Sequence, residues 1–133
     1  MKRTVQPSDL ELQILGVLWR GGPMNVRQVL AAMPDGKRRA YTSILSVMQV
    51  MEKKGFLTHH TLGNTHVYRP TVARQHVLGG VLRRLVQNVF GGSSLAAVQH
   101  LIQDEGLSQE ELHEIQRLLD ARRRPRHAAD DKE

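Results

Sequence analysis

The sequence predicts a mainly α-helical protein with a small β-hairpin wing, followed by a second segment of three helices. Apolar residues recur at intervals of three and four through most of the 133 residues, a pattern typical of helices that bury one face. Residues 56–61 and 65–69 instead have the composition of strands, and Leu62-Gly63-Asn64 supplies the turn between them. Paired glycines and prolines separate these elements along the chain.

Two helices are predicted before the third, and each has a recognisable start. Ser8 and Glu11 form an S-x-x-E capping box for the first helix, which ends at Gly21-Gly22. Asn25 is a candidate N-cap for a short second helix. Pro34-Asp35-Gly36 breaks that second helix before the basic residues that follow.

A third helix is predicted over residues 40–54, and its two faces differ in chemistry. At about 100° per residue, one face is apolar and is expected in the core: Ile44, Val47, Met48 and Met51. The opposite face carries hydroxyl, amide and ammonium groups, which bind base edges and phosphates: Thr42, Ser46, Gln49 and Lys53. A helix-turn-helix followed by a β wing has this order of elements, so the front half predicts DNA binding.

The candidate DNA contacts form two groups. Base reading is expected from the polar side chains of the third helix: Thr42, Ser43, Ser46 and Gln49. Phosphate contacts are expected from residues that flank this helix and from the hairpin: Arg38, Arg39, Tyr41, Lys53, His66 and Arg69. The exposed hairpin tip at Gly63-Asn64 completes the predicted surface.

Charge divides the chain in the same way. Residues 1–76 hold 11 basic and 4 acidic side chains, a net charge of +7, whereas residues 77–133 hold 8 and 9, a net charge of −1. A basic front half suits a polyanion, and a near-neutral back half suits a different role. Many basic proteins bind no nucleic acid, so charge alone does not decide the function.

The back half is predicted to be helical and to dimerise. Its helices are expected at residues 72–90, after Ser93 or Ser94, and after a second capping box at Ser108 and Glu111. Three short helices bury little surface alone, so a second copy is expected to cover their apolar faces. These faces comprise Leu78, Leu82, Leu85, Val89, Phe90, Leu95, Val98, Leu101, Ile102, Leu112, Ile115, Leu118 and Leu119. The alternative is that the three helices fold back on the front domain.

These elements give a plan of two domains and a tail. A winged-helix DNA-binding domain is expected at residues 1–70 and a helical dimerisation domain at residues 71–121. Residues 122–133 lack periodicity and are expected to form a disordered tail. The arginines that begin this tail suit a helix C-terminus, or they contact DNA.

The sequence holds no motif for catalysis or for a cofactor, so an enzyme is not expected. His59, His60 and His66 lie in the hairpin and raise the hypothesis of a metal site. A structural zinc site needs four ligands, and no carboxylate is expected beside these histidines, so phosphate contacts are favoured over a metal. There is no cysteine, no signal-peptide pattern and no apolar run long enough to span a membrane, so we expect a cytoplasmic protein.

The sequence resembles the penicillinase-repressor family of bacterial transcription factors, the BlaI and MecI type. The likeness covers about residues 8–120. Three landmarks in this order, A-Y-T, E-K-K-G and Y-R-P, are more specific than a generic winged helix. The segments that carry the likeness are Leu10-Glu11 to Leu18-Trp19, Val26-Arg27-Gln28-Val29-Leu30, Ala40-Tyr41-Thr42 through Glu52-Lys53-Lys54-Gly55, Val67-Tyr68-Arg69-Pro70, Phe90-Gly91-Gly92-Ser93 and Leu107-Ser108.

The resemblance implies a homodimeric repressor that binds a double-stranded palindrome of TACA/TGTA type and blocks promoter access. It makes the helix that starts at Ala40-Tyr41-Thr42 the reading helix. In the antibiotic-responsive members, a membrane sensor protease triggers cleavage of the fifth helix, which falls near His100-Leu101 here. A ligand bound between the domains, or no induction, are the alternatives. The copper-responsive branch carries a C-terminal cysteine motif, which this chain lacks.

Two further expectations concern the glycine pair and the competing function. Gly79-Gly80 departs from the family's usual helical run, and two glycines cost about 2 kcal/mol relative to alanine, so a kink, a hinge or a close helix approach is expected there. The competing function is a winged-helix module that binds only proteins. Such a module is expected to show an apolar or acidic face on its third helix, whereas this face is polar and cationic.

Overall fold

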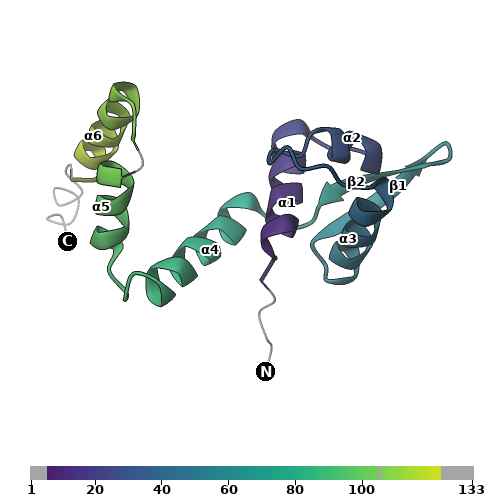
Figure 1. Ribbon diagram of the computed structural model, residues 1–133, viewed down its shortest axis with the longest axis horizontal. Coiled ribbons are helices and arrows are strands. Elements are labelled where there is room, and N and C mark those ends of the chain that lie inside the picture. Colours follow the sequence, from purple (N-terminus) through teal and green to yellow (C-terminus); the bar gives the residue numbers. More distant parts are fainter. Residues whose placement is uncertain (1–5, 105, 124–133) are drawn as a thin grey trace, which may run out of the picture. The chain divides into compact units, whose positions relative to one another are not determined.

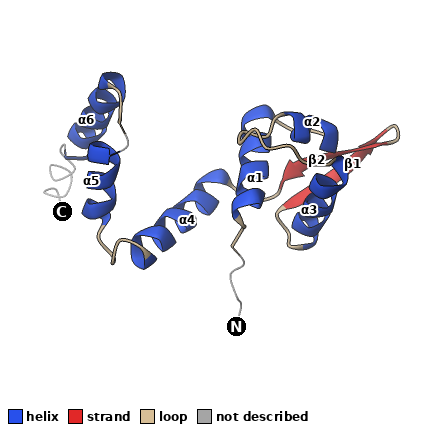
Figure 2. Ribbon diagram, in the orientation of Figure 1, coloured by secondary structure: helices blue, strands red, loops and turns tan. Residues whose placement is uncertain are grey.

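The computed structural model describes residues 6–104 and 106–123, and within them the chain forms six helices and one antiparallel hairpin (Figures 1 and 2). The prediction of a mainly helical fold with a β-hairpin wing is confirmed. In chain order the elements are α1 (Asp9–Gly21), α2 (Val26–Ala31), α3 (Tyr41–Lys53), β1 (Leu57–Leu62), β2 (Thr65–Pro70), α4 (Arg74–Asn88), α5 (Ser94–Asp104) and α6 (Gln109–Arg123).

The chain divides into two compact units between Arg83 and Arg84, inside α4, rather than after residue 70 as expected. The beginning of α4 belongs to the front unit because side chains around it pack there. Val72 lies against the front core, and the indole N–H of Trp19 donates a hydrogen bond to the Val72 carbonyl at 3.3 Å. Val77 is the buried residue of α4.

The predicted capping box of α1 and the predicted N-cap of α2 both form. The Ser8 hydroxyl accepts a hydrogen bond from the Glu11 N–H, and the Glu11 carboxylate accepts one from the Ser8 N–H. Asn25 and Gln28 exchange the same pair of bonds at the start of α2. Each box satisfies N–H groups that a helix start leaves without partners, typically stabilising the helix by about 1 kcal/mol.

The core of the front unit lies where α1, α2 and α3 meet the hairpin. It includes the predicted inner face of α3, since Ile44, Met48 and Met51 are fully buried and Val47 is partly buried. Burying each such side chain stabilises the fold by about 1.5–3 kcal/mol. The other core side chains are Ile14, Leu15, Leu18, Val26, Val29, Phe56, Leu57 and Tyr68.

The hairpin turns over two residues, Gly63 and Asn64, and projects beyond the helices of the front unit (Figure 1). Leu62 was expected in the turn but pairs with Thr65 as the last residue of β1. Gly63 has a φ of +65°, as the first turn position of a type II′ hairpin requires. Met24 and Tyr68 exchange backbone hydrogen bonds at 3.1 and 2.8 Å, which ties β2 to the connection between α1 and α2.

In the back unit, the alternatives at the start of α5 are resolved. The Ser93 hydroxyl accepts a hydrogen bond from the Ala96 N–H at 3.0 Å, so Ser93 caps α5. Ser108 and Glu111 form the predicted capping box of α6. This helix runs to Arg123, so the expectation that the tail begins at residue 122 is wrong for Arg122 and Arg123, while residues 124–133 lie outside the described part.

The expected kink at Gly79-Gly80 does not interrupt α4, which is continuous through both glycines. A Cβ atom added at either glycine would meet no described atom within 4 Å beyond its chain neighbours and the adjacent backbone of α4. Close packing among the described residues therefore does not require these glycines. Among the described residues, no helix has the length and apolar character needed to cross a bilayer.

Candidate nucleic-acid interface

The outer face of α3 is polar and accessible, as its periodicity predicts. Thr42, Ser43, Ser46, Gln49 and Lys53 are all exposed, while the opposite face lies in the core. Burial of the apolar face fixes the rotation of the helix about its axis. The fold therefore presents three hydroxyls, one amide and one ammonium group on a single rigid element.

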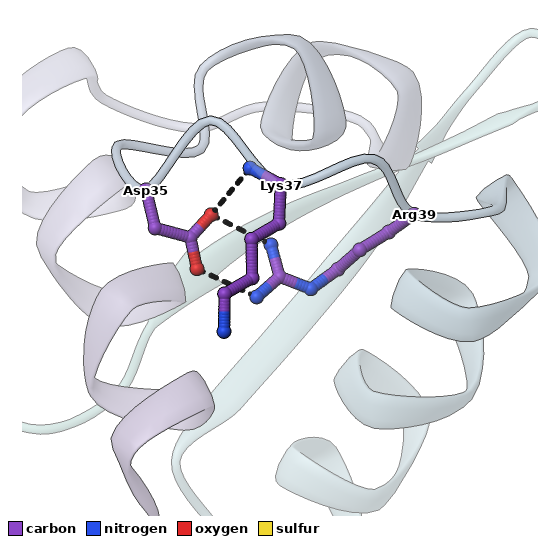
Figure 3. A network of polar contacts seen from close by, with 3 residues as sticks. All are labelled: Asp35, Lys37 and Arg39. Carbon is purple, nitrogen blue, oxygen red and sulfur yellow. Dashed lines mark hydrogen bonds and ion pairs between the residues drawn. The ribbon is translucent and has the colours of Figure 1, made fainter.

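Asp35 holds together the loop that leads into α3 (Figure 3). Its two carboxylate oxygens accept hydrogen bonds from the two terminal guanidinium nitrogens of Arg39, at 2.9 and 2.7 Å. One of them also accepts a bond from the Lys37 N–H at 3.1 Å. The guanidinium of Arg39, followed by the Lys37 N–H, holds the pKa of the Asp35 carboxyl far below its usual range.

This pairing separates two arginines that were both expected to contact phosphate. The charge of Arg39 is engaged by Asp35, which favours a structural role for Arg39 over the expected phosphate contact. Arg38 is exposed, and no carboxylate of the described residues forms an ion pair with it. Both arginines were predicted to contact phosphate because only the conformation of the loop distinguishes them.

Of the three charged residues at the C-terminal end of α3, two are paired with residues of other elements and one is exposed. The carboxylate of Glu52 is hydrogen-bonded to Nδ1 of the His59 ring on β1, with its two oxygens at 2.8 and 3.0 Å from that nitrogen. Lys54 donates to the buried carboxylate of Glu11 at 2.9 Å. Burial alone would raise the pKa of the Glu11 carboxyl, but hydrogen bonds from Lys54 and the Ser8 N–H hold that pKa below its ordinary value. Lys53 is left exposed beside the polar face.

The histidines of the hairpin lie on two different faces. His59 stacks on His66 with ring centroids 4.1 Å apart, and the register places His60 and Arg69 on the opposite face of the hairpin. The expectation that no carboxylate lies near these histidines is wrong, since Glu52 contacts His59. Even so, the described residues hold no group of three or more histidine or carboxylate side chains suited to a metal ion.

A hollow of about 280 Å³ lies between α2, α3 and the hairpin. Two predicted phosphate contacts, Tyr41 and His66, line it together with the predicted base contact Gln49. The hollow also contains Arg27, whose guanidinium carbon lies 4.8 Å from the centre of the Tyr41 ring. Sequence reasoning missed Arg27 because its only signal was an exposed basic position on a short helix. Arg69 lies outside the hollow lining.

Most of the apolar face predicted for dimerisation is exposed. None of the described residues of α5 or α6 is buried. The exposed members of the predicted set are Leu82, Leu85, Val89, Leu95, Val98, Leu101, Ile102, Leu118 and Leu119. Leu78, Phe90, Leu112 and Ile115 are partly buried within the chain. His100, at the bond expected for cleavage, pairs with Asp104 at 3.0 Å on the surface of α5.

Comparison with known proteins identifies the family. The sequence model for "Penicillinase repressor" matches residues 7–121. The chain belongs to the penicillinase repressor family. The resemblance seen in the sequence is thereby confirmed, and the protein is a DNA-binding transcriptional repressor rather than an enzyme.

Individual relatives agree with this membership. A "Transcriptional regulator BlaI" from Mycobacterium tuberculosis is 31% identical over 108 residues, which cover 80% of this chain and 78% of that protein. The "Penicillinase repressor" of Bacillus licheniformis is 25% identical over 120 residues, which cover 90% and 94%. A solution structure of the DNA-binding domain of the repressor BlaI is 30% identical and covers 56% of this chain and 90% of that one, with a TM-score of 0.48.

Proposed function

We propose that this repressor acts as a homodimer, in which each copy places α3 in a major groove of a palindromic operator and so blocks promoter access. The observation that carries this proposal is the two-faced helix α3. Its apolar face is fixed in the core by Ile44, Met48 and Met51, while its hydroxyl and amide face is fully accessible. A rigidly held polar helix is the element that reads base edges in helix-turn-helix proteins.

The side chains of this face suit particular base contacts. Gln49 has an amide that pairs with adenine in two hydrogen bonds, and the hydroxyls of Thr42, Ser43 and Ser46 bond to several bases. A palindrome of TACA/TGTA type, which the family resemblance implies, offers adenines to such an amide. Phosphate contacts are assigned to Arg38, Tyr41, Lys53, His66 and Arg69, while the charge of Arg39 is engaged by Asp35.

The exposed apolar face of the back unit supports dimerisation. Leu85, Val98 and Ile102 are each more than two-fifths exposed, at 43%, 45% and 43%, on helices whose opposite sides are polar. Large apolar side chains exposed along one face of a helix are typical of interaction surfaces in soluble proteins. A second copy covers the patch with the same residues, and a twofold pair of α3 helices matches the two halves of a palindrome.

For release of DNA, we propose cleavage near His100-Leu101 by a sensor-controlled membrane protease. Both side chains are exposed on α5, at 51% for the His100 side chain and 52% for Leu101. A cut there would separate Leu95 and Val98 from Ile102, and so divide the apolar face of α5. Co-expression with an activated membrane sensor protease should deplete the full-length chain, while a chain carrying His100→Pro persists. Equal loss of both chains would refute this route.

The DNA-reading role is tested by removing the base contacts without touching the core. Ser46→Ala with Gln49→Ala is expected to abolish the preference for the operator over a scrambled duplex, while weak binding to both persists. The matched control is Ser94→Ala with Gln99→Ala, which removes the same groups from exposed positions of α5. Gel-shift titrations that showed unchanged discrimination in the first variant would refute the assignment of the reading face.

A further inference from the structure

We propose that the hollow between α2, α3 and the hairpin holds the sugar–phosphate backbone that separates two adjacent grooves of the operator, and that Arg27 is its charged contact. This inference rests on the proposed function, because it requires α3 to lie in the major groove. It assigns a role to Arg27, and it places the hairpin on the far side of one DNA strand.

The argument begins with the arrangement of the two projecting elements. The hollow is lined by Tyr41 and Gln49 from α3 on one side and by Asn64 and His66 from the hairpin on the other. In B-form DNA, a major groove about 12 Å wide alternates with a minor groove about 6 Å wide. One sugar–phosphate backbone forms the ridge between them. With α3 in the major groove, the space between α3 and the hairpin is where that ridge passes.

The lining of the hollow suits a phosphate. Arg27, Tyr41, Asn64 and His66 bring guanidinium, hydroxyl, amide and imidazole groups from α2, α3 and the hairpin to one place. All of these groups can donate hydrogen bonds to phosphate oxygens. Among the described residues, no carboxylate is part of the lining. The hollow can therefore accept an anion without first displacing an internal ion pair.

The charge of Arg27 is both held in place and available. Its guanidinium lies over the Tyr41 ring, within the range of a cation–π contact, which limits the conformations of a long side chain before DNA arrives. Within the described part of the chain it forms no ion pair, in contrast to Arg39 and Lys54. A guanidinium stacked on a ring keeps its edge N–H groups free for two bonds to one phosphate.

The test measures how binding depends on salt. Arg27→Ala is expected to weaken binding to the operator and to a scrambled duplex by similar factors, and to lower the slope of log K against log salt by about 1 per subunit. Arg20→Ala is the matched control, since it removes the same charge from an exposed position of α1 that does not line the hollow. Thermal unfolding by circular dichroism checks that both variants are folded.

Two further measurements locate the contact. Ethylation of single operator phosphates is expected to identify one that blocks the unmodified protein but not Arg27→Ala. Tyr41→Leu, which removes the ring beneath the guanidinium, is expected to weaken binding more than Tyr41→Phe does. If Arg27→Ala leaves both affinities and the salt slope unchanged, the hollow does not hold the backbone, although operator preference would still support the proposed function. If the unmodified protein binds no DNA, the proposed function itself fails.

Discussion

The ammonium of Lys54 lies 2.9 Å from the carboxylate of Glu11, and this ion pair joins the end of α3 to the beginning of α1. Glu11 is almost completely buried, with 4% of its surface exposed. The preceding residue, Lys53, is exposed and takes no part in this pair. Two adjacent lysines of one motif therefore differ: Lys54 is held in an ion pair, whereas Lys53, the proposed phosphate contact, is exposed.

Substitution of the two lysines is expected to separate these roles. Lys54→Ala leaves the Glu11 carboxylate without its cation and should lower the free energy of unfolding by about 1–2 kcal/mol. This is less than the roughly 3–5 kcal/mol for breaking a fully buried pair, because Lys54 is partly solvated. Lys53→Ala should leave stability unchanged and reduce the salt slope of DNA binding by about 1. Urea titrations measure the stability of each variant, and gel shifts measure the salt slope. A stability loss in Lys53→Ala with a lower salt slope in Lys54→Ala would contradict these assignments.

The same carboxylate makes stability depend on pH. The pKa of Glu11 is lowered in the fold from an ordinary value of 4.5. The unfolded chain therefore binds the proton more tightly, so the stabilisation is fully present above pH 4.5 and is lost as pH falls through the lowered pKa. Urea unfolding should show that Glu11→Gln has a lower free energy of unfolding than the unmodified protein at pH 7. This difference should shrink as the pH is lowered to 3. A gap that widened on acidification would show that the sign is wrong.

Arg38 and Arg39 are expected to behave differently although they are neighbours. Arg38→Ala should lower the salt slope of DNA binding by about 1 per subunit, because Arg38 is assigned to a phosphate. Arg39→Ala should reduce affinity without changing that slope, because its charge is already engaged by Asp35. Asp35→Asn supplies the decisive comparison. If Arg39 positions the loop, Asp35→Asn weakens binding; if Arg39 contacts phosphate, freeing it strengthens binding.

The apolar face of the back unit predicts a concentration-dependent dimer. Leu85→Asp places a charge in the proposed contact and should shift the protein to monomer in sedimentation velocity. Operator affinity should fall about 10²-fold or more, since two linked half-sites bind far more tightly than one. Gln87→Asp adds the same charge at an exposed polar position of the same helix and should change neither property. A dimer that survived Leu85→Asp would place the interface elsewhere.

Local sequence signals predicted most of the fold. The capping boxes at Ser8 and Ser108 and the N-cap at Asn25 formed as expected, because each cap bonds to a residue only three positions away. The hairpin shifted by about one residue, since a turn of two residues and one of three have similar composition. The helical periodicity of α3 predicted its exposed and buried faces because both follow from one rotation of the helix.

The electrostatic details of the site were harder to predict. Glu11 and Lys54 lie 43 residues apart, and only the packing of α1 against the end of α3 joins them. Arg27 and Tyr41 likewise meet through the arrangement of α2 and α3. The carboxylate beside His59 was missed because Glu52 belongs to a helix and His59 to a strand. Sequence could therefore identify the charged residues but not which of them pair with one another.

The exposed leucines of α5 and α6 would also link the stability of the proposed dimer to its concentration. With none of their described side chains buried, these helices gain little from packing within one chain. In the proposed dimer, the folded state of α5 and α6 then depends on the concentration of the chain. Chains too dilute to pair would then be more open to proteolysis than paired chains. Abundance and turnover of the repressor would thus reinforce each other.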